Sequence, residues 1–254
     1  MNVSILNVTD NEVEPLRELQ RQETPLAALL SSGEHQGYFQ TYLITLGGAH
    51  AAYGTVGHDD RWHRAPTVFE LYIRPEFRAF GETIFADFTA STNASAFEFQ
   101  TSDAGLSAIL SSWCGEAVVD KIIFSDSLTT FLPGYGTIIH QFWPSDVAKV
   151  FQHHSQPVGD WVLEFDGKIA GTGGMKHRYQ PPYVDLFAEI NPRYRQRGLG
   201  SYLIQELKRL CYDLGLKPCA RCSPDDLPAI RTIERAGFTP CAHVLSGQLL
   251  AQIA

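Results

Sequence analysis

The stretch that decides the fold is Arg195-Gln196-Arg197-Gly198-Leu199-Gly200-Ser201, which lies between two segments of different hydrophobic periodicity. The apolar run over residues 184–190 precedes it and is typical of a buried strand, and Pro192 marks the end of that run. Apolar residues then recur at helical spacing over residues 202–210, which predicts a helix. The order along the chain is therefore strand, glycine-bearing turn, helix.

This turn has the chemical features of a phosphate-binding site. The first turn of a helix carries unpaired backbone N–H groups and the positive end of the helix dipole, and both attract phosphate. Gly198 and Gly200 have no side chains that would hold a ligand away from the backbone, while Arg195 and Arg197 add positive charge. The spacing fits neither the phosphate loop with its Lys-Ser/Thr nor the G-x-G-x-x-G dinucleotide motif. The turn suits a pyrophosphate group.

The pattern Arg195-x-x-Gly198-x-Gly200, after a strand that ends Ile190-Asn191-Pro192, resembles the coenzyme A loop of the GNAT superfamily of N-acetyltransferases. The resemblance extends over most of the second half of the chain, to a helix that ends at Gly237-Phe238. It implies direct transfer of an acetyl group from acetyl-CoA, as co-substrate, to the amine of a small molecule or peptide. The positions it assigns to the coenzyme are Ala188, Glu189, Ile190, Arg195, Gln196, Arg197, Gly198, Leu199, Gly200 and Ser201.

Such a transfer needs a base that takes a proton from the acceptor ammonium. Alternation along the strand puts Asp185 and Glu189 on the same face. The resemblance favours Asp185 as the catalytic base, because many members carry a carboxylate early in this strand. Glu189 is the second candidate, since it is nearer the point where two parallel strands of the fold separate.

The residue that would donate a proton to the leaving thiolate differs from the one that the family usually has. Four residues before Gly237 the family often has a tyrosine, and this sequence has Ile233; Asp226 stands where an asparagine often begins that helix. Water or a tyrosine elsewhere can take that role, the candidates being Tyr194, Tyr202 and Tyr212. A non-catalytic acyl-CoA-binding or scaffold protein is therefore the alternative reading of the sequence.

Two patterns of the second half recur in the first half in the same order. Ile73-x-Pro75-x-x-Arg78-x-x-Gly81 matches the coenzyme loop at an offset of 117 residues, and Ser102-x-x-x-Leu106-x-Ala108-Ile109 matches residues 223–230 at an offset of 121. An internal duplication follows, and with it an α/β (α+β) fold of two tandem GNAT-like domains, each a mixed sheet flanked by helices.

We expect a degenerate domain over residues 1–130 and an acetyl-CoA-binding domain over residues 137–254, separated by a turn-rich stretch. Glu82 and Thr83 of the first copy stand where the second has Leu199 and Gly200, so a negative charge and a β-branched side chain occupy the pyrophosphate position. The first half is therefore not expected to bind coenzyme A.

Hydrophobic periodicity and turn residues predict the remaining elements. Helices are expected over residues 10–22, 80–89, 106–113, 144–153, 202–210 and 227–236. Strands are expected over residues 3–8, 40–46, 49–56, 67–73, 96–100, 118–124, 137–142, 161–165, 168–176, 184–190, 218–221, 240–245 and 248–253.

Composition narrows the partners of this chain of 254 residues. The net charge of −8 disfavours nucleic acids and anionic membrane surfaces as partners, because both require clustered basic side chains. Without an apolar run of membrane-spanning length or a leader-like N-terminus, we expect a cytoplasmic protein, and a homodimer is compatible with the sequence. No metal site is expected, although Cys219, Cys222, Cys241 and His243 can be drawn as a zinc site, which makes a zinc-supported interaction domain a third reading.

Overall fold

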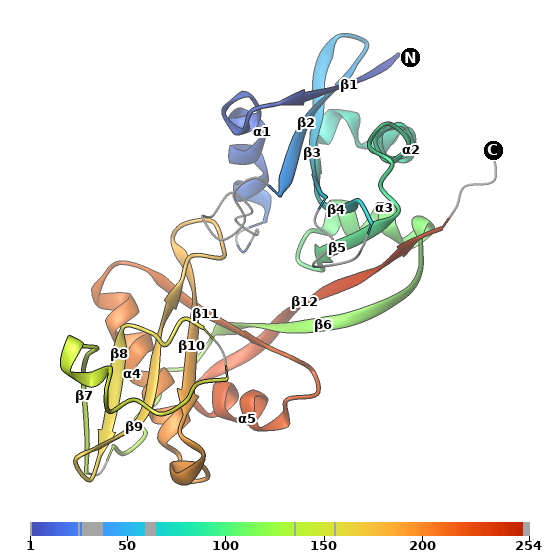
Figure 1. Cartoon of the computed structure of the whole chain (residues 1–254). Coiled ribbons are helices and arrows are strands. Elements are labelled where there is room, and N and C mark those ends of the chain that lie inside the picture. Colours follow the sequence, from blue (N-terminus) through green and yellow to red (C-terminus); the bar gives the residue numbers. More distant parts are fainter. Residues whose placement is uncertain are drawn as a thin grey trace. The chain divides into compact units, whose positions relative to one another are not determined.

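A computed structural model describes residues 2–24, 26, 38–58, 65–134, 136–154 and 156–250. The protein has a mixed α/β fold, in which helices flank a mixed sheet (Figure 1). It divides into two compact units, unit 1 with Met1–Lys121 and Ala242–Ala254, and unit 2 with Ile122–Cys241. Within the described residues, no helix is long and apolar enough to cross a membrane.

Unit 1 is a largely antiparallel sheet with helices on both faces. Its strands are β1 (Val3–Val8), β2 (Phe39–Leu46), β3 (Ala49–Gly57), β4 (Thr67–Ile73), β5 (Ala96–Gln100) and parts of β6 (Cys114–Asp126) and β12 (Phe238–Leu249), and its helices are α1 (Asp10–Glu23), the 3-10 helix η1 (Pro75–Phe80), α2 (Gly81–Thr92) and α3 (Ala104–Trp113). Strands β4 and β5 run parallel. The apolar faces of α2 and α3 pack in one core cluster, and α1 packs in a second.

Unit 2 places a parallel strand pair next to a four-stranded antiparallel region. Its strands are β7 (Thr137–Gln141), β8 (Trp161–Phe165), β9 (Lys168–Lys176), β10 (Tyr183–Ile190), β11 (Lys217–Cys222) and the remaining parts of β6 and β12, and its helices are α4 (Leu199–Asp213), α5 (Leu227–Arg235) and the 3-10 helices η2 (Pro144–Asp146) and η3 (Pro192–Tyr194). The neighbours follow the order β6-β11-β10-β9-β8-β7, with β10 and β11 parallel. Apolar side chains of α4 and α5 form the core against β10 and β11.

The last strand of the chain belongs to the first unit. Residues 244–248 of β12 pair antiparallel with β5, whereas residues 122–125 of β6 pair antiparallel with β11 in unit 2. Each unit is therefore completed by a strand from the other half of the sequence. The two compact units differ for this reason from the expected ranges, residues 1–130 and 137–254, because backbone hydrogen bonding assigns these strands and sequence order does not.

Most predicted helices and strands are confirmed, and two predictions need correction. The helix expected over residues 144–153 is wrong: η2 ends at Asp146, whose carboxylate accepts the Trp143 N–H at 2.8 Å, and Val147, expected on the buried face, is 63% exposed. The two short strands expected over residues 240–245 and 248–253 form one strand, β12, because Gly247 continues the ladder opposite Phe97. Residues 251–253 lie outside the described part of the chain.

The structure supports the internal duplication at its first pattern. The Nε of Arg78 donates to the carbonyl of Ile73 at 3.2 Å, and the Nε of Arg195 donates to the carbonyl of Ile190 at 3.0 Å. The same bond thus recurs at the predicted offset of 117 residues.

The second pattern is out of register by two residues. Asp103 caps α3 by accepting the Leu106 N–H, and Asp226 caps α5 by accepting the Ala229 N–H. These caps fix the helix starts at an offset of 123, so the expected offset of 121 is wrong there.

Candidate coenzyme site

The two parallel strands of unit 2 separate beside the predicted coenzyme residues. The register between β10 and β11 ends at Leu186 and Ala220, whereas the register between β10 and β9 continues to Ile190. The backbone of Ala188, Glu189 and Ile190 therefore extends beyond the parallel ladder along one edge. An extended ligand with amide groups can pair with such an edge as an added strand does.

The loop that follows contains two residues with a left-handed backbone. Gln196 has φ of 62° and Gly198 has φ of 78°, both in the left-handed region. Alternation of left-handed and right-handed backbone forms a concavity of N–H groups that binds anions. Because no side chain caps α4, whose N-cap is Gly198, the N–H groups of its first turn remain available to a ligand.

The two loop glycines are required for different reasons. At Gly198 the left-handed backbone itself favours glycine. At Gly200 a Cβ atom would lie 3.1 Å from Cγ2 of Thr232 and 3.5 Å from Cγ1 of Ile190, so this glycine allows the start of α4 to pack against α5. Leu199 and Ser201 have buried side chains, which leaves their backbone as the part that a ligand can reach.

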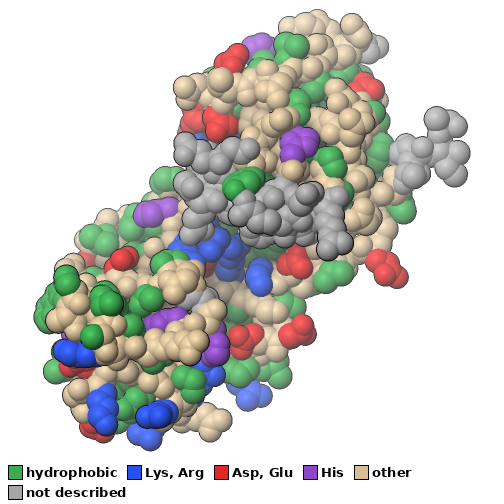
Figure 2. Space-filling view, in the orientation of Figure 1, with side chains coloured by type: hydrophobic (Ala, Val, Ile, Leu, Met, Phe, Trp, Pro, Cys, Tyr) green, Lys and Arg blue, Asp and Glu red, His purple; other side chains and the backbone are tan. Residues whose placement is uncertain are grey.

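Three arginines surround this loop, one of which the sequence analysis missed. Arg195 is held by its bond to the Ile190 carbonyl, and the guanidinium of Arg197 lies 5.8 Å from the ring centroids of Phe165 and Tyr194. Arg235 lies beside Gly198, since a Cβ atom on that glycine would be 3.7 Å from its Nη1. Figure 2 shows Lys and Arg side chains at the end of unit 2 that carries the β10–α4 loop in Figure 1.

Arg235 gave no signal of its own in the sequence. A basic residue in the last turn of a helix is already explained by the helix dipole, so its position near the loop appears only in the tertiary structure.

Asp185, the first candidate for the base, lies in a buried ion-paired cluster. Its Oδ2 is 3.3 Å from Nε of Arg178 and 3.5 Å from Nε of Arg221. Burial raises the pKa of Asp185 to about 6, although the two arginines act in the opposite direction. Its other oxygen, Oδ1, and the hydroxyl of Tyr179 are both buried without a hydrogen-bond partner among the described residues.

Glu189, the second candidate, lies at the strand separation and is partly exposed. Its two carboxylate oxygens are 2.9 and 3.2 Å from the backbone nitrogen of His154, which donates to them. Its partner on β9 is Thr172, whose hydroxyl lies 2.6 Å from Nε2 of His153. The segment that was expected to be helical thus contacts this face of the sheet through two histidines, which sequence reasoning did not assign to the site.

The candidate proton donors differ in their distance from the loop. Tyr212 lies twelve residues beyond Gly200 on α4, about 18 Å along the helix axis, and its hydroxyl donates to Asp126 at 2.5 Å. Burial raises the pKa of Tyr212 to about 12. Tyr194 lies at the loop, against Phe165 and Arg197, and Tyr202 lies in the first turns of α4 beside Gly134. Ile233 is a core residue with 6% of its surface exposed.

The cysteines of the second half do not meet at one point. The thiol of Cys219 donates to the Val184 carbonyl at 3.0 Å, and that of Cys241 is 3.5 Å from the Ile123 carbonyl. Burial raises the pKa of the Cys219 thiol. Among the residues that the structure describes, no three His, Cys, Asp or Glu side chains are arranged to hold a metal ion.

Solved structures of the same fold cover nearly the whole chain. An acetyltransferase of the GNAT family from Colwellia psychrerythraea matches with a TM-score of 0.75 and 11% identity, over 98% of this chain and 100% of the other. A GCN5-related N-acetyltransferase from Sphaerobacter thermophilus matches with a TM-score of 0.57 and 15% identity, over 97% and 95%. A tandem GNAT protein from the clavulanic acid biosynthesis pathway, in a structure without AcCoA, matches with a TM-score of 0.60 and 12% identity, over 97% and 98%.

Comparison at the level of sequence gives a family match for the second half of the chain. No curated protein matches the chain. The sequence model of the acetyltransferase (GNAT) family matches residues 126–238, which contain β10, the loop, α4, β11 and α5. The fold of nearly the whole chain is shared with these solved structures, one of which is a tandem GNAT protein, and residues 126–238 form a domain that matches the model of the acetyltransferase (GNAT) family.

Proposed function

We propose that residues 126–238 transfer an acetyl group from acetyl-CoA to an amine acceptor. The observation that carries this proposal is the start of α4, where a left-handed Gly198 leaves the first-turn N–H groups uncapped next to three arginines. Backbone donors and guanidinium groups in one place are the chemistry that a pyrophosphate requires. The family membership of this segment supports an acyl transfer.

The coenzyme would extend from the loop along β10. The N–H groups of residues 198–201, with Arg195, Arg197 and Arg235, would hold the pyrophosphate. The backbone of residues 188–190 would pair with the amide groups of the pantetheine arm, because β11 has separated from β10 there. Acetyl-CoA, when bound, supplies the acetyl group as a thioester.

We assign the base to Glu189 rather than to Asp185. Glu189 is on the same strand as the coenzyme edge, is partly exposed, and accepts the His154 N–H. Asp185 is 4% exposed and faces two guanidinium groups, so it has no open path to an acceptor amine. Glu189 would take the proton from the ammonium, and the free amine would then attack the thioester carbon. Tyr194 and Tyr202 remain the candidates for the proton donor, since Tyr212 lies at the other end of α4.

Calorimetric titration of the purified protein with acetyl-CoA tests the coenzyme site. We expect binding by the wild type, and at least tenfold weaker binding by the double variant Arg197→Ala, Arg235→Ala, since each guanidinium contact to a phosphate is worth more than a neutral hydrogen bond. The control is Arg209→Ala, which removes an exposed arginine of α4 that lies ten residues after Leu199, the first residue of the helix. No binding by the wild type would contradict the proposal.

A thiol-release assay with a panel of amines then separates the two readings of the site. Release of free coenzyme thiol that depends on an amine supports catalysis. Binding without thiol release supports the alternative, a non-catalytic acyl-CoA-binding protein, for which the core position of Ile233 is the favouring observation.

A further inference from the structure

Unit 1 has a cavity of about 220 Å3 at the end of its own parallel strand pair. The wall is formed by the second half of β4, the end of α1 and the start of α3, and it includes Glu23, Tyr72, Arg78, Asp103, Ala108 and Ile109. The volume is well above the ~10–15 Å3 that a single water molecule requires. It therefore has room for a small ligand.

The cavity occupies the place that corresponds, through the duplication, to the coenzyme site of unit 2. Residues 71–73 correspond to residues 188–190 at the offset of 117, and Arg78 corresponds to Arg195. The β4–β5 register ends at Val68 and Phe97, so these strands also separate before the cavity. In both halves of the protein, a parallel strand pair thus separates at the corresponding position.

The chemistry of this recess excludes a pyrophosphate. Gly81, the counterpart of Gly198, has a right-handed backbone with φ of −55°. Glu82 adds a negative charge to the first turn of α2, and its carboxylate accepts the Ser112 hydroxyl and the Trp113 Nε1–H. The Glu23 carboxylate already binds Arg78 and accepts the hydroxyl of Tyr72 at 2.9 Å. Arg78 is therefore neutralised from within the chain.

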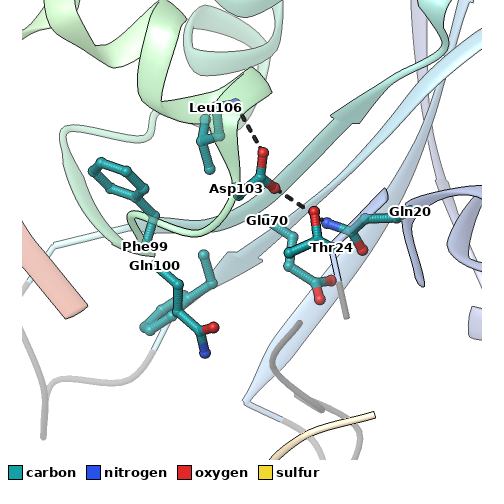
Figure 3. A pocket seen from close by; sticks show the side chains of 8 residues that line it. Gln20, Thr24, Glu70, Phe99, Gln100, Asp103 and Leu106 are labelled. Atoms are coloured by element: carbon teal, nitrogen blue, oxygen red, sulfur yellow. Dashed lines mark hydrogen bonds between the residues drawn. The ribbon is translucent and has the colours of Figure 1, made fainter. Parts of the chain in front are cut away.

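The charges that remain around the cavity are negative. Its lining has two carboxylates, Glu23 and Asp103, and one guanidinium, Arg78. A second cavity of about 30 Å3 adjoins it through Thr24 and Asp103 (Figure 3), and the Glu70 carboxylate in its lining lies 3.9 Å from the Arg17 guanidinium. Burial raises the pKa of Asp103, whose carboxylate is held by Gln20 and the Leu106 N–H. A positive charge nearby would offset this cost of burial.

The rest of the wall is apolar. The lining includes Leu71 and Ile73 of β4 and Ala108 and Ile109 of α3. A ligand with a cationic end and a short hydrocarbon chain suits both parts of the wall.

We propose that this cavity of unit 1 binds a small aliphatic primary amine in its protonated form, with the ammonium group near Asp103 and the chain against Ala108 and Ile109. The site is separate from the coenzyme site and does not depend on it. The first half of the chain would thereby keep a ligand site after losing the residues for a phosphate.

Calorimetry with n-butylamine as the probe, at pH 7.5, tests the proposal on the full chain. Butyrate and 1-butanol, of the same chain length, serve as the anionic and neutral comparisons. We expect n-butylamine to bind at least tenfold more tightly than either comparison. Equal binding of 1-butanol, or no binding of n-butylamine, would overturn the proposal.

The duplication provides a matched pair of variants. Asp103→Asn removes the charge in the cavity while keeping a residue that caps a helix well, and Asp226→Asn makes the same change at the equivalent cap of α5. We expect at least tenfold weaker binding of n-butylamine with Asp103→Asn and unchanged binding with Asp226→Asn. Equal effects of the two variants would refute the assignment.

A second variant keeps the test valid if Asp103→Asn does not fold. Ala108→Phe places a ring into the cavity from α3 and leaves every charge in place. Loss of n-butylamine binding, with acetyl-CoA titration as at wild type, is the expected result; retained n-butylamine binding would show that the ligand lies elsewhere.

Discussion

At the scale of single residues, Asp185 and Glu189 lie on the same face of β10 and have different surroundings. Asp185 is buried and faces Arg178 and Arg221, whereas Glu189 is partly exposed and accepts the His154 N–H. We therefore expect Glu189→Gln to lower kcat by about 10²–10⁴-fold with little change in acetyl-CoA affinity, since general base catalysis contributes an effect of that size. Steady-state kinetics with a responsive amine measures it.

The control for this prediction is Asp185→Asn at the other carboxylate. We expect Asp185→Asn mainly to reduce stability, because it removes a buried negative charge that faces two guanidinium groups. Acetylation that is lost with Asp185→Asn at unchanged stability, and kept with Glu189→Gln, would reverse the assignment of the base.

Glu70 of β4 gives a residue-scale prediction for pH. Burial raises the pKa of Glu70 from 4.5 to about 7, although Arg17 and Thr55 oppose this shift. Between pH 4.5 and about pH 7, the Glu70 carboxyl holds a proton in the folded protein and has released it in the unfolded chain. The contribution of Glu70 to stability is thus fully present below pH 4.5 and is lost as the pH rises through about 7.

Urea unfolding between pH 5 and pH 8 checks the sign. We expect the free energy of unfolding of the wild type to fall with rising pH, by at most about 1.4 kcal/mol per pH unit from this group, and the Glu70→Gln variant to show a smaller slope. Asp185, also buried with a raised pKa, adds a slope of the same sign that both proteins share. Identical slopes in the wild type and Glu70→Gln would contradict the prediction, and the exposed Glu116→Gln serves as control.

At the scale of elements, helix α4 has a left-handed glycine at each end. Gly198 precedes it with φ of 78°, and Gly215 follows it with φ of 73°. Alanine at either position has to adopt a left-handed backbone, which costs about 1–2 kcal/mol. A Cβ atom on Gly215 would meet nothing within 4 Å, so the backbone cost stands alone there.

Gly198→Ala and Gly215→Ala should therefore destabilise the protein by similar amounts and differ in function. We expect only Gly198→Ala to weaken acetyl-CoA binding, because only that change disturbs the N–H groups at the start of α4. Chemical denaturation and calorimetry on both variants decide the matter. Equal affinities in the two variants would mean that the start of α4 does not bind the coenzyme.

At the scale of the whole molecule, β12 links the end of the chain to the fold of its first half. Residues 244–248 give β5 its antiparallel partner, and Leu249 donates to the Ser95 carbonyl at 2.9 Å. A chain that ends at Cys241 would leave the β5 backbone groups on this side unpaired. We expect hydrogen exchange at residues 97–100 to become much faster in that truncated chain. Protection as in the full chain would contradict the role of β12.

The sequence by itself determined the local elements of this protein. The strand, the glycine-bearing loop and the helix between residues 184 and 213 follow from spacing and backbone preference, which act over a few residues. The GNAT fold was predicted from the resemblance of the loop to that family, and the tandem arrangement from the repeated patterns of the two halves. The predicted helix over residues 144–153 failed because its apolar positions meet no core, and burial rather than periodicity decides whether such a segment becomes helical.

Only the tertiary structure decided what lies around those elements. Several contacts join residues that are far apart in the chain. They are the pairing of β6 with β11 and of β12 with β5, the approach of Arg178 and Arg221 to Asp185, and the position of Arg235 beside the loop. Hydrogen bonds and ion pairs at such separations depend on which backbone edges and charges folding brings together, and no local pattern encodes that choice. The cavity of unit 1 belongs to this class as well, since it arises where three elements leave space between them.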